Sequence, residues 1–390
     1  MTRLTRAGLL LAGTIAALLT TAAPAAAHGA DAPNGSDYRT EVTAVTPADG
    51  QLRVRVVEAG ARLELTNTGS EPVEVIGYSG EPYLRVGPDG VFENTRSPAT
   101  YLNRTIAGDT VLPAEVDPAA APNWRRVDDG PTARWHDQRT LWREAGPPAQ
   151  VRAAPDREHR VRDWVVPLRA ADGPREIRGT LDWVPPPDAY AWWVVVTLGA
   201  LAVGAAGLLP AASRPGRRVL AGLGGLLICG GLAAVLLTVG RVRDAGADGV
   251  GAVLAGLLTG PVWPLLAGLA ALAAGGWVIA GTAPRRTAVP VAGATLRPTA
   301  TAAGARLPHG DFALAMVGAC LALFAGVTNA AVFGRSVPPV PWPATAARLL
   351  VVVVMVAGAG ALAAAVLRLH AAGRAARPAP AATAVDAARD

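Results

Sequence analysis

Apolar and polar positions alternate through the first half of the chain, whereas the second half consists mainly of long apolar segments. Leu52, Val54 and Val56, for example, are separated by single arginines, and the sequence Gly-Pro-Asp-Gly at 87–90 is a strong turn signal. Alternation interrupted by turns predicts short antiparallel strands that each bury one face. We therefore expect residues 28–184 to form an all-β sandwich of the immunoglobulin-like type.

Two stretches depart from the alternating pattern. Residues 94–134 contain five prolines and no clear periodicity, which predicts long loops over one end of the sandwich. Three prolines at 185–187 predict a short, stiff link over residues 185–189, which joins the sandwich to the apolar half.

Five apolar segments predict a helical membrane domain over residues 190–368, because about 20 apolar residues in a helix span the hydrocarbon core. Their approximate limits are 190–211, 219–240, 250–281, 312–333 and 344–367. The third segment is too long for one straight helix, and Pro261 and Pro264 interrupt it. We expect a half-helix at 249–259, at the outer surface or dipping partly inward, and the span itself at 261–281.

The chain begins with the three parts of a secretory signal peptide. Two arginines precede a short apolar run, and three consecutive alanines end at Ala27. We expect residues 1–27 to be removed, so that His28 becomes the first residue of the mature protein. An uncleaved anchor is the alternative.

The charge distribution indicates how the chain is oriented in a membrane. Residues 28–188 carry 19 Arg and 25 acidic residues, whereas residues 189–390 carry 15 Arg and 5 acidic residues. With the first half outside, 11 arginines flank the inner ends of the apolar segments and 4 flank the outer ends. This bias predicts a multi-pass protein of the bacterial cytoplasmic (inner) membrane, with residues 28–188 extracytoplasmic and a disordered tail, 369–390, in the cytoplasm. We expect no nucleic-acid partner, because the basic excess lies beside apolar segments.

The sequence carries no catalytic signature. It has no nucleophile elbow, no phosphate-binding glycine loop, no HExxH pair and no paired-cysteine metal site. Its two cysteines, Cys229 and Cys320, lie in apolar segments, so the exported half has no disulfide and no thiolate for a blue-copper centre. The apolar segments contain no Asp, Glu or His, which argues against an ion-coupled transporter. We therefore do not expect an enzyme or a transporter.

The sharpest chemical feature is the expected N-terminal histidine. His28 would offer its α-amino group and its imidazole to one metal ion, and both groups lose a proton readily near neutral pH. Cu(II) favours nitrogen ligands in a tetragonal arrangement. The best further ligands are His136 and Asp137, although neighbours on a strand face opposite sides, so both can bind only at a bend. We predict a copper site formed by His28, His136 and Asp137.

Each of the two histidines also has an alternative interpretation without metal. His28 can simply reflect where cleavage falls, and His136 can be hydrogen-bonded among the tryptophans that flank it.

Two resemblances follow from these residues. A signal peptide that ends in Ala-x-Ala directly before His28 resembles that of the periplasmic copper-resistance chaperones, whose mature N-terminal histidine binds Cu(II). The exported half resembles actinobacterial membrane proteins of unassigned function, through GYSGEPYL at 77–84, SPATYLN at 97–103, WHDQRTLW at 135–142 and GTLDW at 179–183. The second resemblance implies the same layout, an exported β domain followed by membrane helices, and implies no activity.

Taken together, the residues predict a membrane-anchored extracytoplasmic binding protein, with copper as the candidate cofactor. The alternative is an interaction module without metal, in which the sandwich binds a protein or cell-envelope partner and the helices anchor it. The tyrosines and tryptophans of the exported half would then form the recognition surface.

Overall fold

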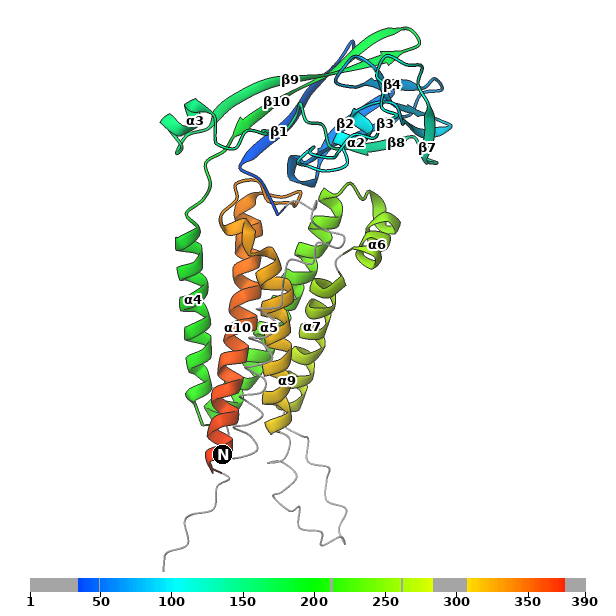
Figure 1. Cartoon of the computed structure of the whole chain (residues 1–390). Coiled ribbons are helices and arrows are strands. Elements are labelled where there is room, and N and C mark those ends of the chain that lie inside the picture. Colours follow the sequence, from blue (N-terminus) through cyan, green and yellow to red (C-terminus); the bar gives the residue numbers. More distant parts are fainter. Residues whose placement is uncertain (1–33, 49, 211–212, 261, 283–306, 376–390) are drawn as a thin grey trace, which may run out of the picture.

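The computed structural model describes residues 34–48, 50–210, 213–260, 262–282 and 307–375. The expected signal peptide, His28 and most of the expected cytoplasmic tail lie outside these residues. An antiparallel β region comes first and a helical region follows, and the β region lies over one end of the helices (Figure 1).

Two antiparallel sheets make up the β region. The larger sheet has the strand order β1-β10-β9-β4-β5-β6-β7, and the smaller sheet has the order β2-β3-β8. The strands are β1 (Tyr38–Thr46), β2 (Leu52–Val57), β3 (Arg62–Asn67), β4 (Val73–Ile76), β5 (Pro82–Gly87), β6 (Gly90–Asn94), β7 (Trp124–Asp128), β8 (Thr132–Trp135), β9 (His159–Ala170) and β10 (Gly173–Trp183). The short helical turns between them are η1 (Glu58–Gly60), α2 (Ala99–Leu102) and α3 (Ala149–Ala153).

Both sheets bury apolar side chains in one core. The smaller sheet contributes Leu63, Leu65 and Trp135, and the larger sheet contributes Val166 and Ile177, each at most 3% exposed. Successive side chains of a strand point to opposite faces, so the alternation in the sequence produces one buried face per strand. The antiparallel strands predicted from that alternation are confirmed.

The prediction that residues 94–134 contain only loops was wrong, because β7 lies within this stretch and β8 begins there. β7 is an edge strand of the larger sheet and is exposed along almost its whole length. An edge strand that buries neither face has no reason to alternate apolar and polar residues. β8 is only four residues long, which is too short to show a period.

Within the described residues, five helices are long and apolar enough to cross a membrane. The elements of the helical region are α4 (Ala189–Ala205), η2 (Ala206–Leu208), α5 (Arg214–Asp244), α6 (Gly249–Thr259), α7 (Val262–Thr282), α9 (Leu307–Cys320), the π-helical turn η3 (Leu321–Val327), η4 (Ala330–Phe333) and α10 (Ala344–Ala375). Residues 184–188 connect β10 to α4. The predicted break in the third apolar segment is confirmed, since α6 and α7 are separate helices.

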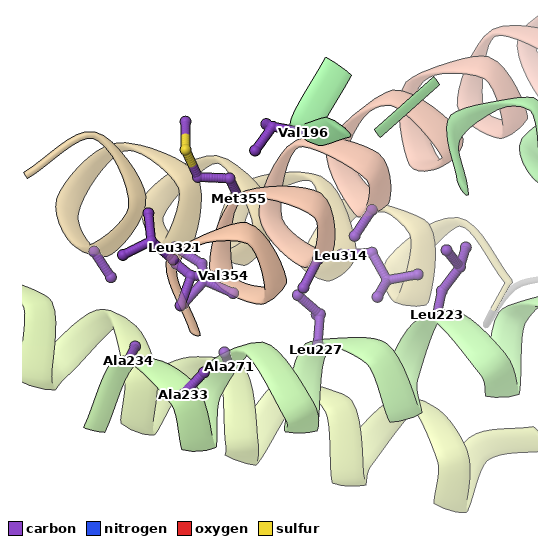
Figure 2. Close-up of a cluster of buried hydrophobic side chains, with 14 of the residues drawn as sticks. Val196, Leu223, Leu227, Ala233, Ala234, Ala271, Leu314, Leu321, Val354 and Met355 are labelled. Atoms are coloured by element: carbon purple, nitrogen blue, oxygen red, sulfur yellow. The ribbon is translucent and has the colours of Figure 1, made fainter. Parts of the chain in front are cut away.

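Glycines allow α5 and α7 to approach closely. A Cβ atom on Gly231 would lie 2.6 Å from the carbonyl oxygen of Gly268, and one on Gly275 would lie 2.4 Å from that of Gly224. Beside this pair of helices, apolar side chains of α5, α9 and α10 fill the interior, and Leu227 is one of them (Figure 2). Small residues at helix contacts are the usual solution for helices that pack in lipid.

Polar contacts hold the β region on the helices. Asp37, directly before β1, accepts hydrogen bonds from Arg335 Nη1 at 2.6 Å and from the backbone N–H of Ser336 at 3.0 Å. At the end of α5, Asp244 Oδ2 accepts the backbone N–H of Ala59 at 2.8 Å. The two halves of the molecule are therefore joined by side chains as well as by the link.

Candidate functional site

A cavity of about 470 Å³ opens on the flank of the β region. Its lining residues come from β5, β6 and β7 of the larger sheet and from β8 and Arg62 of the smaller sheet. His136, which follows β8 directly, contributes to the wall. This volume falls within the range of small-molecule sites, about 300–1,000 Å³.

His136 uses both of its ring nitrogens within the protein. It is 1% exposed, its Nδ1 lies 2.8 Å from the carbonyl oxygen of Ala61, and Arg62 Nε donates to its Nε2 at 3.1 Å. Because an arginine can only donate, Nε2 must be the acceptor, and the ring proton then lies on Nδ1 and is donated to Ala61. A metal ion could bind Nε2 only after Arg62 moved away.

Asp137 is completely buried and is saturated with donors. Its carboxylate accepts from Trp135 Nε1 at 3.0 Å and from Arg139 through the backbone N–H at 3.1 Å, Nε at 2.8 Å and Nη2 at 2.7 Å. Arg139 also donates to the carbonyl oxygen of Ile76. Through Arg139, Asp137 joins the segment after β8 to β4, so its role in the described structure is to stabilise the fold.

The structure gives separate partners to two of the three residues predicted to bind copper. His136 and Asp137, which lie just after β8, have different partners, and His28 lies outside the described residues. Among the residues that are described, no group of three or more His, Cys, Asp or Glu side chains is placed to hold a metal ion. His159 lies apart from the cavity, where its Nε2 pairs with the carbonyl oxygen of Ala154 at 2.7 Å.

The charged side chains of the cavity wall are three arginines and two carboxylates. Arg62, Arg104 and Arg134 line it, together with the acidic residues Glu93 and Asp128. Glu93 is already paired with Arg125, which lies outside the lining. The lining therefore holds one more cationic than acidic side chain.

The three arginines differ in how strongly they are engaged. Arg134 Nε is held by Glu64 at 2.5 Å, and Arg62 Nε lies 3.4 Å from Glu58. Arg104 instead stacks on the ring of Tyr101, 4.7 Å from its centre, and forms no ion pair within the described part of the chain. Its guanidinium is the one best placed to take up a new anionic partner.

Tyr83, which also lines the cavity, is 5% exposed, and burial raises the pKa of its hydroxyl well above the usual range. The hydroxyl therefore stays protonated at neutral pH and adds no negative charge to the site.

One wall of the cavity is tied to the helical region. Arg134 Nη2 donates to the carbonyl oxygen of Gly246, in the loop between α5 and α6, at 2.8 Å. Arg55 donates to the same carbonyl oxygen at 3.1 Å and pairs with Asp248 at 2.8 Å. Glu64, which is 5% exposed, lies between the two arginines, and its hydrogen bond is the main cause that raises the pKa of Arg55.

Sequence reasoning found His136 and Asp137 but missed the cavity arginines. These lie on β3, after α2 and on β8, so only the fold brings them together. No local signal marks them, because the chain contains 36 basic residues and all of them are arginine.

No protein-family model, curated protein or solved structure matches this chain. The function is therefore inferred from the geometry of the cavity and from the layout of the chain.

Proposed function

We propose that this chain is a membrane-anchored binding protein of the bacterial envelope, which takes up a small anionic ligand in the cavity beside His136. In this proposal the β region is an immunoglobulin-like sandwich outside the cytoplasmic membrane, the five apolar helices span the membrane, and the C-terminus is cytoplasmic. The arginine bias supports this orientation. Trp192 and Trp193, in the first turn of α4 near the β region, are aromatic residues of the kind that lie at a membrane interface.

Three arginines converge on one cavity, and this observation supports an anionic ligand. Guanidinium groups bind carboxylates and phosphates through two parallel hydrogen bonds, a geometry that a point charge does not provide. Arg104 forms no ion pair among the described residues, so it would contact the anionic group first.

Thermal unfolding of the full chain in detergent tests ligand binding, with inorganic phosphate and succinate as the two probes. At least one probe should raise the unfolding temperature, because a ligand that binds only the folded state stabilises it. Arg104→Gln should weaken the apparent affinity about tenfold, a loss of about 1.4 kcal/mol. Arg53→Gln, in an exposed arginine of β2 outside the cavity, is the control and should bind as the parent does. Identical responses from the two variants would refute the cavity as the site.

Cysteine labelling tests the membrane orientation. Cys229 and Cys320 are replaced by alanine, and a single cysteine is introduced by Asp172→Cys, in the turn between β9 and β10, or by Arg374→Cys, near the end of α10. A maleimide that cannot cross membranes should label D172C in intact cells, and R374C only after permeabilisation. The reverse pattern would overturn the orientation.

Copper binding at the mature N-terminus is the second candidate, and the observation in its favour is that His136 lines the same cavity. Cu(II) titration of the processed protein, beside a form with one extra residue before His28, tests the chelate directly. A weaker affinity in the extended form supports copper, since the extra residue removes the terminal amino group from His28. Equal affinities eliminate it.

A further inference from the structure

The short helix α6 lies at the end of the helical region that faces the β region (Figure 1). Its sequence, GVGAVLAGLLT, has no charged residue, and none of its residues is buried. Val250, Leu254 and Leu258 are 79%, 56% and 77% exposed. Residues four apart in a helix lie on the same face, so these three form one continuous apolar stripe.

The opposite side of α6 rests on the protein. Val253, Gly256 and Leu257 are half-buried, and a Cβ atom on Gly256 would lie 2.5 Å from Val242 Cγ1 of α5. A surface helix that faces water normally carries polar residues opposite its packed side. α6 carries apolar residues there, and its one side-chain hydroxyl, on Thr259, donates a hydrogen bond to the carbonyl oxygen of Ala255.

We propose that α6 lies in the outer leaflet of the membrane, with Val250, Leu254 and Leu258 against the acyl chains of the lipids. The next helix, α7, also exposes apolar side chains, and its Leu266 and Leu269 are 51% and 48% exposed. Trp263, 62% exposed in the first turn of α7, has the chemistry of a residue at the boundary between headgroups and acyl chains. The inference rests on the proposed membrane placement of the five long helices.

Lipid contact at α6 has a consequence for the cavity. The loop between α5 and α6 carries Gly246 and Asp248, which bind Arg55 and Arg134 of the β region. Arg134 is also part of the cavity wall. A helix held in the outer leaflet therefore fixes the height of the cavity above the membrane surface.

Spin labelling tests this inference on the full chain in phosphatidylglycerol–phosphatidylethanolamine vesicles. Single cysteines are introduced by Leu254→Cys, by Leu198→Cys in the middle of α4, where Leu198 is 61% exposed, and by Asp172→Cys, in a background without Cys229 and Cys320. Each spin label is then exposed to oxygen, which concentrates in lipid, and to a nickel chelate, which stays in water. Oxygen should reach the labels at 254 and 198, and both labels should be shielded from nickel. The label at 172 should be accessible to nickel and less accessible to oxygen.

Each other outcome for L254C overturns the inference. Access by nickel would place α6 in water, and shielding from both reagents would show that another protein surface covers the stripe. The label at 198 separates this failure from that of the proposed function. If nickel also reaches residue 198, the membrane placement itself fails; if it reaches only residue 254, the placement stands and the lipid contact is refuted.

Discussion

At the scale of single residues, the buried ion pair of the helical region is the strongest constraint. Arg368 of α10 is 1% exposed, and its Nε donates to Asp311 Oδ1 of α9 at 2.7 Å. Its Nη1 donates to the carbonyl oxygen of Gly216 in α5 at 3.3 Å. Arginine is seldom buried so completely unless an anion compensates it. The pair therefore joins three helices and makes each partner depend on the other.

Removing one partner should be worse than removing both. Asp311→Asn leaves the Arg368 charge buried without its anion and should lower the free energy of unfolding by about 3–5 kcal/mol. The double variant Asp311→Leu/Arg368→Met removes both charges and should recover most of the loss. Thermal unfolding in detergent measures both effects.

The control for this prediction is Glu74→Gln, which disrupts a partly exposed pair with Arg169. It should cost at most about 1 kcal/mol. A double variant as unstable as Asp311→Asn alone would show that the loss does not come from an uncompensated Arg368 charge.

The environment of a single residue could be predicted from the sequence only where neighbouring residues determine it. The different partners of His136 and Asp137 agree with the prediction that these neighbours face opposite sides, although both residues lie just after β8 and not on it. The partners of His136, namely Ala61 and Arg62, are more than 70 positions away. No local pattern carries that information, so the engagement of both ring nitrogens could not be predicted.

At the scale of elements, prediction succeeded where burial imposes a period. The paired strands of the large sheet each bury a face and alternate in sequence, whereas the five long helices were predicted from the length of their apolar stretches. β7 was missed because it is an exposed edge strand, and the limits of α5 and α10 were drawn too short because both extend beyond their apolar stretches. Chain stretches that bury little leave no periodic signature.

The contact between α5 and α7 gives a prediction with a control in the next residue. Gly275→Val would place its Cβ 2.4 Å from the carbonyl oxygen of Gly224, whereas a Cβ on Gly276 has nothing within 4 Å. Overpacking should therefore cost Gly275→Val about 1–3 kcal/mol and separate the two helices, while Gly276→Val should be close to neutral. Unfolding temperatures in detergent compare the two variants, and equal temperatures would contradict the close packing.

At the scale of the whole molecule, the β region and the helices are joined at more than one point. Ser36 and Val337 form an isolated β-bridge, and Asp37 beside it binds Arg335 and Ser336. At a second point, Arg55 and Arg134 hold the carbonyl oxygen of Gly246, and Ala59 holds Asp244. Such contacts join residues far apart in sequence through polar groups, so hydropathy gives no hint of them. They turn two domains on a linker into one unit with a fixed cavity orientation.

The Asp37 contact is where this unit should open first if it is weakened. Asp37→Ala removes the partner of Arg335 and Ser336, and hydrogen bonds to a charged group contribute about 1.5–3 kcal/mol. The opened population should rise at least about tenfold, and protease cleavage in the link at 184–188 should rise with it, because cleavage follows that population.

Limited proteolysis of the detergent-solubilised chain measures this opening, and Asp163→Ala is the control, because Asp163 forms an exposed ion pair with Arg160 that lies within the β region. The control should be cut at the rate of the parent protein. Equal cleavage of all three proteins would mean that the contacts around Gly246 and Asp244 hold the β region in place without Asp37. In that case the anchor of the cavity would be the loop that leads into α6, and variants of Arg55 and Arg134 would release the β region instead.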